Sequence, residues 1–296
     1  MSPRLFAISA ILAALALVAL IPGRAQWYAY NELHPRREPV PAPPASNLEA
    51  VMLHTSDGLT LHGWLGASRN GAAVIFGHGL PGTRLQLWPA AEALWTAGYG
   101  VLVFDFRGQG QSEGRPGWGD AEQLDFDAAV SFVRARVPGR IGAVGFSMGG
   151  SVVVEVAARD PRVAAVTVQG TFTSLADDIH HSYGRWGPFS EAPARALLRW
   201  SGVNVASVRP GDRICSISPR PVLLIYGTRD LMTPIAAAHA MEWLACEPKA
   251  FWLVEGAAHG GYRAVDPREY DRRVRAFFDA ALLKRPEGID RSEDSR

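Results

Sequence analysis

The fold of this chain is decided by residues 140–150, which read RIGAVGFSMGG. An apolar run typical of a buried strand ends at a serine placed between two glycines, and a helix-forming run, SVVVE, follows at residues 151–155. The pattern Gly145-x-Ser147-x-Gly149 is typical of a nucleophile elbow, a tight and strained strand-to-helix turn. It predicts an exposed Ser147 hydroxyl and a Met148 N–H at the positive end of the helix, ready to stabilise an oxyanion. Because so short a pattern also occurs by chance, an ordinary Gly/Ser turn is the alternative until partners are found.

The composition is that of an ordinary globular protein. The 296 residues are 48% hydrophobic and 20% charged, which suits one α/β domain with appendages and argues against wholesale disorder. The formal net charge is +1 and no long basic block is present, so nucleic acid is not an expected partner. Cys215 and Cys246 are too few for a zinc ribbon or a disulfide framework. One bridge between them in an oxidising compartment, or two buried free thiols, both remain open.

An apolar segment occupies residues 5–21 near the N-terminus, interrupted only by Ser9. Its length is near the lower limit for crossing a bilayer, about 17–25 residues. We expect residues 1–25 to be an uncleaved membrane anchor; a signal peptide cleaved after GRA at residues 23–25 is the alternative, which would make the protein secreted or periplasmic. Either reading places the folded domain at or beyond the membrane. Arginines on both sides of the segment leave its orientation open.

Residues 26–47 are expected to form a proline-rich linker, stiff and extended over residues 34–44. The sequence WYAY at residues 27–30 fits either a membrane interface or packing on the domain. A β-hairpin is predicted next, because strand-like segments at residues 50–55 and 59–65 flank a turn that contains Asp57-Gly58.

Short apolar runs then alternate with helix-length segments. The apolar runs lie at residues 72–76, 101–104, 141–144, 163–168, 222–226 and 251–254, and the helical patterns at 84–96, 120–136, 151–159, 235–245 and 267–283. Unbroken apolar runs are typical of strands covered on both faces, so the pattern predicts an α/β fold with a mainly parallel central sheet flanked by helices. The hairpin would add an antiparallel edge. We expect this domain to cover residues 48–285, before a polar C-terminal tail at 286–296.

One insertion, at about residues 170–218, interrupts the alternation. It is longer than a plain connection needs and carries a helical pattern near residues 191–201. Long connections often serve as lids, so a small lid is predicted, with a surface excursion over the sheet edge as the alternative. Its apolar side chains suggest either an apolar acyl group in the substrate or packing within the lid itself: Trp186, Phe189, Leu197, Leu198 and Trp200.

Ser147 is a weak nucleophile unless a base takes its proton and an acid orients that base. Functional groups in open α/β sheets gather beyond the carboxyl ends of the strands. Asp230 follows the strand-like run at residues 222–227, and His259 follows the run at 251–256. The order Ser147, Asp230, His259 is the hydrolase order, and each residue comes after a predicted strand. This agreement favours a true nucleophile elbow over a chance match.

Five motifs occur in a fixed order: HGLPG at 78–82, DFRGQGQS at 105–112, the elbow, the stretch 221–230 and GAAH at 256–259. In this order they resemble the α/β-hydrolase superfamily over residues 48–283, in particular its membrane-anchored or secreted serine hydrolases related to esterases and prolyl-aminopeptidase-like enzymes. The resemblance implies an α/β-hydrolase fold with Ser147 as nucleophile, His259 as general base and then acid, and Asp230 orienting the imidazole. It also implies an oxyanion hole formed by the backbone N–H groups of Leu80 and Met148.

Other polar residues of these motifs have structural explanations. Glu255 stands at a strand end only four residues before the histidine, a poor geometry for bracing it. His78 is expected to bind the backbone of its own loop. Asp105 and Arg107 are expected to fix loops near the site rather than to react.

The expected function is hydrolysis of carboxylic esters or thioesters through an acyl-enzyme on Ser147. This chemistry needs no cofactor. His180 and His181 in the lid lack carboxylates at ligand spacing, so no metal site is predicted. The expected substrate is a small-molecule or lipid-like ester, because a membrane anchor would bring acylated substrates within reach.

Two alternatives remain. A serine exopeptidase or amidase of the same fold would need carboxylates for a substrate's ammonium group, and the lid offers only Asp177, Asp178 and Glu191. A non-catalytic, membrane-tethered binding protein is the second, although it would have no need of all three triad residues. The oligomeric state does not follow from the sequence.

Overall fold

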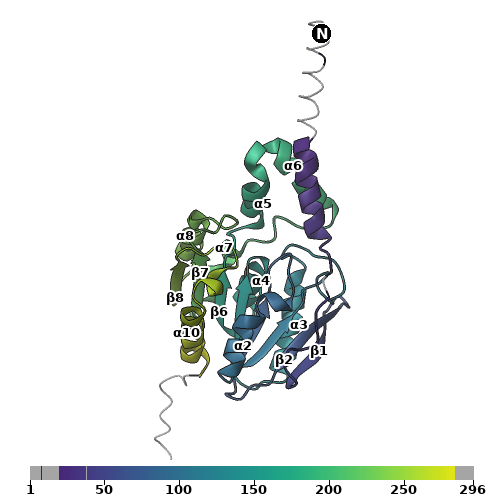
Figure 1. The fold of residues 1–296 in the computed structure, drawn as a ribbon. Coiled ribbons are helices and arrows are strands. Elements are labelled where there is room, and N and C mark those ends of the chain that lie inside the picture. The colour runs from purple at the N-terminus through teal and green to yellow at the C-terminus, as the bar shows by residue number, and fades with distance from the viewer. Residues whose placement is uncertain (1–7, 9–19, 38, 284–296) are drawn as a thin grey trace, which may run out of the picture.

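The computed structural model describes Ile8, residues 20–37 and residues 39–283. These residues form an eight-stranded sheet with helices on both faces (Figure 1). The sheet order is β1-β2-β4-β3-β5-β6-β7-β8. The strands are β1 (Leu48–His54), β2 (Thr60–Gly66), β3 (Ala73–Gly77), β4 (Gly100–Phe104), β5 (Ile141–Phe146), β6 (Val163–Gln169), β7 (Val222–Gly227) and β8 (Lys249–Val254). β2 pairs antiparallel with β1 and β4, whereas the other neighbouring pairs are parallel, which confirms the predicted sheet and hairpin.

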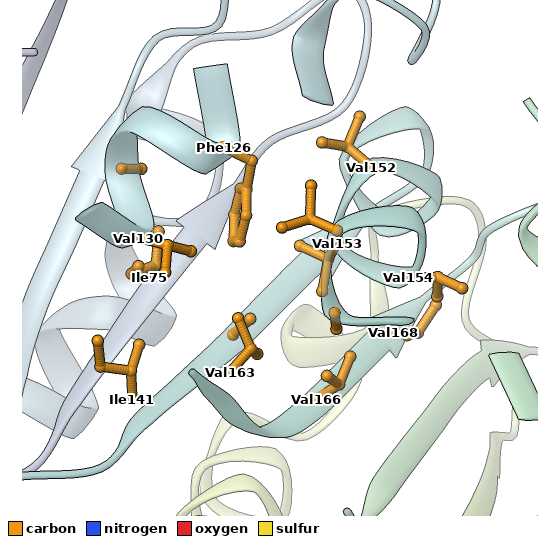
Figure 2. Packing of buried hydrophobic residues seen from close by; sticks show 14 of the residues in the cluster. Ile75, Phe126, Val130, Ile141, Val152, Val153, Val154, Val163, Val166 and Val168 are labelled. Carbon is orange, nitrogen blue, oxygen red and sulfur yellow. The ribbon is translucent and has the colours of Figure 1, made fainter. Parts of the chain in front are cut away.

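The two faces of the sheet are covered by different helices. α2 (Trp88–Thr96), α10 (Pro267–Phe278) and η4 (Asp279–Leu283) pack on one face. On the other lie α3 (Glu122–Arg134), α4 (Met148–Arg159) and α8 (Ile235–Leu244). Figure 2 shows Val152 and Val153 of α4 and Phe126 of α3 packed against the sheet. β3, β4 and β5 are buried along their whole length, which is why their sequences read as unbroken apolar runs.

The connection from β6 to β7 builds a cap. It contains α5 (Leu175–Tyr183), η2 (Gly184–Trp186), α6 (Pro188–Trp200), α7 (Pro210–Arg213) and η3 (Ile214–Ile217). A helix at residues 20–33 lies beside this cap (Figure 1). Its Ala25, Ala29 and Leu33 are buried in one cluster with Ile179 of α5 and Leu198 of α6. The cap is therefore made by two parts of the chain that are far apart in sequence.

The helix at residues 20–33 corrects the expected linker, because residues 26–33 are helical, whereas residues 34–37 and 39–47 form neither helix nor strand. The reason is a stripe of small and apolar residues four apart, which the cap buries. Trp27, Tyr28 and Tyr30 point away from this contact and are exposed. Most of the apolar segment 5–21 and the predicted tail 286–296 lie outside the described residues. Within the part that is described, no helix has the length and apolar character needed to cross a bilayer.

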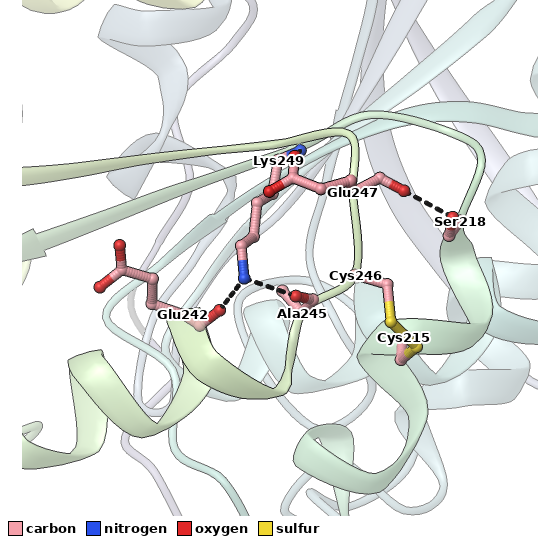
Figure 3. The surroundings of a disulfide bond; sticks show 7 residues. All are labelled: Cys215, Ser218, Glu242, Ala245, Cys246, Glu247 and Lys249. Atoms are coloured by element: carbon pink, nitrogen blue, oxygen red, sulfur yellow. Dashed lines mark hydrogen bonds between the residues drawn. A yellow bond between two sulfur atoms is a disulfide. The ribbon is translucent and has the colours of Figure 1, made fainter.

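A disulfide joins Cys215 of η3 to Cys246, with a Cα–Cα distance of 4.6 Å (Figure 3). Of the two alternatives that the sequence leaves open, the structure therefore has the bridge. It ties the connection before β7 to the turn that leads into β8. A second contact joins the same segments, since the Ser218 hydroxyl donates to the Glu247 carbonyl at 2.6 Å. Lys249 adds two hydrogen bonds from its Nζ to carbonyls at the end of α8.

Candidate active site

Ser147 stands in the turn between β5 and α4 with φ 53° and ψ −121°, a conformation that a residue with a side chain rarely adopts. Neighbouring backbone fixes the turn. The Ser147 N–H donates to the Gln169 carbonyl at 2.8 Å, and the Thr171 hydroxyl donates to the Ser147 carbonyl at 2.7 Å. The flanking glycines are required, since a Cβ at Gly145 or Gly149 would collide with backbone. The local geometry is that of a nucleophile elbow.

The three residues predicted to form a triad lie together. His259 Nε2 is 3.0 Å from Ser147 Oγ, and His259 Nδ1 is 2.8 Å from Asp230 Oδ2. A carboxylate can only accept, so the imidazole proton resides on Nδ1 and Nε2 is free to accept from the serine hydroxyl. This protonation state is the one that a general base for Ser147 requires.

Asp230 is held by four hydrogen-bond donors. Oδ1 accepts from the backbone N–H groups of Met232 (2.9 Å) and Thr233 (2.8 Å), while Oδ2 accepts from His259 and from the Tyr262 hydroxyl (2.6 Å). Burial raises the pKa of Asp230, but the hydrogen bonds from His259, Thr233 and Tyr262 outweigh it and hold that pKa below its usual value. The carboxylate therefore stays ionised while bracing the imidazole.

Tyr262 is the residue of this network that the sequence reasoning missed. It begins the short helix α9 (Tyr262–Val265), three residues after His259, and its ring is buried. A buried tyrosine needs a hydrogen-bond partner, and the signal available in the sequence was its position directly after the histidine loop. Glu255, the alternative acid, is exposed, and no hydrogen bond joins it to His259 among residues 39–283.

Leu80 and Met148 are the residues whose backbone N–H groups are predicted to form the oxyanion hole. Both residues line the same pocket as Ser147 and His259. Neither N–H has a hydrogen-bond partner within the described ranges, and that of Met148 is at the N-terminus of α4. A backbone N–H without a partner at the wall of such a pocket suits the proposed role of stabilising a developing negative charge.

The loop that carries Leu80 is fixed by His78. The buried His78 imidazole contacts the Gly79 carbonyl at 2.7 Å through Nδ1 and accepts from the Phe106 N–H at 3.0 Å through Nε2. Burial lowers the pKa of His78, which matches a neutral ring that donates at one nitrogen and accepts at the other. His78 thus has the structural role expected from the sequence.

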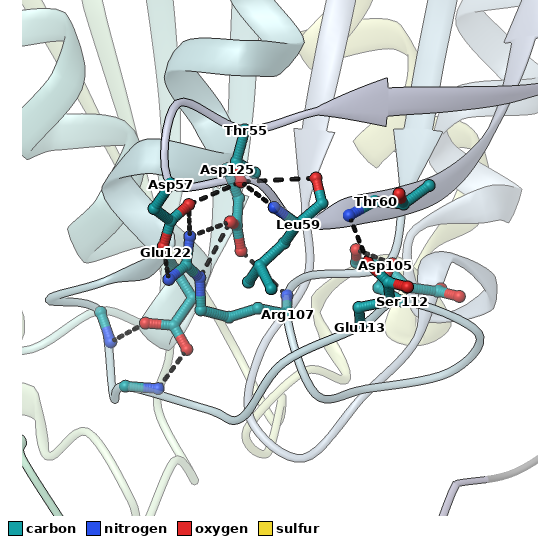
Figure 4. Close-up of polar contacts among 12 residues, drawn as sticks. Thr55, Asp57, Leu59, Thr60, Asp105, Arg107, Ser112, Glu113, Glu122 and Asp125 are labelled. Carbon is teal, nitrogen blue, oxygen red and sulfur yellow. Dashed lines mark hydrogen bonds and ion pairs between the residues drawn. The ribbon is translucent and has the colours of Figure 1, made fainter.

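Asp105 and Arg107 also hold loops, as expected. The Arg84 guanidinium donates to both oxygens of the buried Asp105. Arg107 forms ion pairs with Asp125 of α3 at 2.7 Å and with Asp57 of the hairpin turn at 2.9 Å (Figure 4). These contacts connect the hairpin, the loop after β4 and the helix α3 around the site without lining its pocket.

The pocket over Ser147 is small, with a volume of about 40 Å³. Its walls come from the elbow, the Leu80 loop, the cap and the helix at residues 20–33. They are formed by Glu32, Leu80, Trp118, Ser147, Met148, Phe172, Leu175, Asp178, Ser182, Met232, Thr233 and His259. The apolar lid residues of the sequence analysis are not among them: Trp186, Phe189 and Trp200 are exposed, and Leu198 packs inside the cap.

Other polar residues of the cap are engaged elsewhere. His180 contacts Glu191 at 2.8 Å and His181 contacts the Leu231 carbonyl at 2.7 Å. Asp177 binds Ser174 and Thr173 at the start of α5. In the described part of the chain, no group of three or more His, Cys, Asp or Glu residues is arranged to hold a metal ion.

Comparisons with known proteins agree with this geometry. Residues 72–189 match a family model described as the alpha/beta hydrolase fold. An uncharacterized protein of Mycobacterium tuberculosis is 31% identical over 90% of this chain and 95% of its own length. The chain belongs to the α/β-hydrolase superfamily.

Two further α/β-hydrolase comparisons are informative. A Pyrococcus furiosus esterase structure superposes with a TM-score of 0.72 at 25% identity, covering 84% of this chain and 98% of the esterase. The quorum-quenching protein AidA of Acinetobacter baumannii is 41% identical over 206 residues, 66% of this chain and 56% of its own. The fold prediction and the superfamily resemblance are thereby confirmed, and the chain is an α/β hydrolase.

Proposed function

We propose that this α/β hydrolase cleaves carboxylic esters or thioesters by a Ser147–His259–Asp230 triad through an acyl-enzyme. The observation that carries the proposal is the unbroken chain of hydrogen bonds from Ser147 Oγ through both imidazole nitrogens to Asp230, with the serine at a strained elbow. The esterase among the structural neighbours is in keeping with it.

The reaction would proceed in two halves. Ser147 Oγ attacks the substrate carbonyl while its proton passes to His259 Nε2, and the N–H groups of Leu80 and Met148 hold the resulting oxyanion. Collapse of the tetrahedral intermediate breaks the bond to the alcohol or thiol, which leaves with the proton from His259. Water then gives its proton to His259 and attacks the acyl group, and Ser147 recovers a proton as the acid departs.

Asp230 would act through the imidazole rather than on the substrate. When His259 becomes positively charged, the ionised carboxylate stabilises it and keeps Nδ1 protonated. Tyr262 and the two backbone donors hold this carboxylate in place, so they act as positioning groups for the triad.

Hydrolysis of p-nitrophenyl esters from two to twelve carbons tests this function. Wild type should turn over at least one of these esters, and Ser147→Ala should lose the activity by about three orders of magnitude or more. Ser182→Ala is the matched control, because Ser182 lines the same pocket but has no place in the hydrogen-bonded chain. Equal rates for wild type and Ser147→Ala would overturn the proposal. Activity confined to the shortest esters would argue against a lipid-like substrate.

Amide cleavage by the same residues is the second candidate function. Of the lid carboxylates that could bind a substrate's ammonium group, Asp177 accepts from Ser174 and Thr173 at the start of α5, and Glu191 pairs with His180 and Arg195. Asp178 alone of the three lines the pocket. Aminoacyl-nitroanilides cleaved faster than the p-nitrophenyl esters would favour an exopeptidase, and a protein inert toward both would favour a binding role.

For location, we propose that the domain resides outside the reducing cytosol, attached through the apolar segment 5–21 or released after its cleavage. The Cys215–Cys246 bridge supports this proposal, since disulfides persist mainly in oxidising compartments. Alkaline phosphatase fused after residue 283 should be active in a bacterial host, and carbonate extraction of its membranes separates an anchored protein from a released one. An inactive fusion with a stable hydrolase domain would contradict the proposal.

A further inference from the structure

Two carboxylates face the pocket over Ser147 and take no part in the triad. Glu32 comes from the helix at residues 20–33, and Asp178 comes from α5. Glu32 accepts from the Tyr183 hydroxyl at 2.9 Å. The Asp178 side chain makes no hydrogen bond or ion pair with the described residues, and it is partly buried.

Neither carboxylate forms an ion pair with another described residue. Burial raises the pKa of Glu32 to about 6, and burial together with the charge of Glu32 raises the pKa of Asp178 to about 7. No Lys or Arg lines this pocket among residues 20–37 and 39–283, and His259 is the basic residue in its walls. Arg24, Arg185 and His181 line a neighbouring cavity on the outer side of Glu32, but none of them forms an ion pair with it. Partly buried carboxylates without an ion-pair partner attract a cation that enters the pocket, because water screens them less than it screens exposed ones.

The remaining walls suit a cation that carries carbon. Trp118 and Phe172 supply aromatic rings, and both are buried. Trp118 is held in an unusual backbone conformation, φ 55°, and its indole N–H has no partner in the described part of the chain. Aromatic faces beside carboxylates attract ammonium groups through the ring quadrupole as well as through charge.

We propose that Glu32 and Asp178 select substrates that bear an ammonium group close to the ester bond, with the helix at residues 20–33 supplying one of the two specificity residues. This inference rests on ester hydrolysis at Ser147. The ammonium group can belong to the acyl part, as in an aminoacyl ester, or to the alcohol part, as in an amino-alcohol ester. The small volume of the pocket favours a short substituent over a long chain.

The test compares esters that differ only by charge. Alanine benzyl ester and benzyl isobutyrate differ by an ammonium against a methyl group on the acyl side. 2-(Dimethylamino)ethyl butyrate and 3-methylbutyl butyrate form the matching pair on the alcohol side. Wild type should prefer the cationic member of one pair by about 30-fold or more in kcat/KM. The pair that shows this preference tells whether the ammonium group belongs to the acyl part or to the alcohol part of the substrate.

Variants assign the preference to residues. Glu32→Gln and Asp178→Asn should each reduce the preference by about tenfold or more while the neutral esters are still hydrolysed. Asp177→Asn is the matched control, because this neighbouring carboxylate is exposed and lies outside the pocket. A wild type that hydrolyses neutral esters without preferring either cationic ester, or variants that keep the preference, would overturn the inference and leave the proposed function intact. If wild type hydrolysed none of these esters, the proposed function itself would be refuted.

The pH dependence gives a readout that a purely structural role would not change. With pKa values of about 6 for Glu32 and about 7 for Asp178, both carboxylates are largely ionised at pH 8 and largely protonated at pH 5, so the preference for the cationic ester should fall as the pH is lowered through this range. The other titratable or charged groups near the pair are the Tyr183 hydroxyl and His259 and, in the cavity on the outer side of Glu32, His181, Arg24, Arg185 and the Tyr28 hydroxyl. A ratio that stays constant from pH 5 to pH 8 would contradict the inference.

Discussion

Replacement of Asp230 by Asn offers the sharpest test of how the imidazole is held. The amide has one acceptor oxygen where the carboxylate has two, and both oxygens of Asp230 are occupied by two donors each. If the amide NH₂ faces His259, the imidazole must carry its proton on Nε2 and cannot accept from Ser147. If the amide is flipped, the NH₂ faces two backbone donors, which are then left unsatisfied in the interior.

The size of the activity loss follows from the free-energy difference between these two amide orientations. Two buried unsatisfied donors cost about 1–3 kcal/mol each, so the arrangement that keeps the working imidazole is disfavoured by roughly 2–6 kcal/mol. This corresponds to a loss in kcat/KM of about 30-fold to 10⁴-fold, since each factor of ten needs about 1.4 kcal/mol.

The assay is p-nitrophenyl ester hydrolysis by wild type, Asp230→Asn and Tyr262→Phe, with a thermal melt of each. Tyr262→Phe is the matched control, because it removes one donor to Asp230 but leaves the imidazole proton on Nδ1; we expect it to lose less than about tenfold. An Asp230→Asn protein that melts like wild type and keeps more than a third of its kcat/KM would refute the reasoning.

Three further predictions concern stability. Gly149→Ala should give a destabilised or insoluble protein, with a loss of about 3 kcal/mol or more in urea unfolding, because the new Cβ would collide with two carbonyl oxygens at the end of β3. Replacing both Cys215 and Cys246 by Ala should lower the free energy of unfolding by about 3–4 kcal/mol, from the 31-residue separation that the bridge closes, without changing kcat/KM; an unchanged urea midpoint would count against it. Arg107→Ala should cost about 3–5 kcal/mol because it leaves buried Asp125 unpaired, whereas Arg159→Ala, at an exposed ion pair, should cost less than about 1 kcal/mol; similar losses in the two would contradict this reading.

Much of the fold could be predicted because the local and global signals agree. The strands β3 to β7 are buried on both faces, so their sequences carry an unbroken apolar pattern. The glycines of the elbow could be recognised because a side chain at either position would collide with neighbouring backbone. The positions of Ser147, Asp230 and His259, which follow β5, β7 and β8, could also be predicted from the sequence. Parallel strands bring their carboxyl ends to one edge, and all three side chains lie there.

What the sequence could not supply depends on contacts between distant segments. Glu32 lies in a region expected to be a linker, and only the burial of Ala29 and Leu33 against the cap makes that region helical and brings Glu32 to the pocket. The apolar stripe was present in the sequence, but nothing in it identified the surface that would cover it. Tyr262 was missed for a similar reason, since its bond to Asp230 depends on the path of the histidine loop.

The most direct test of the central claim is labelling by a fluorophosphonate probe, followed by mass spectrometry of the digested protein. The account predicts one phosphonyl group per wild-type chain, attached to Ser147, and none on Ser147→Ala. It also predicts that His259→Ala is labelled at least about 100-fold more slowly, because the serine then has no base. Labelling of another residue, or equal labelling rates for wild type and His259→Ala, would contradict it.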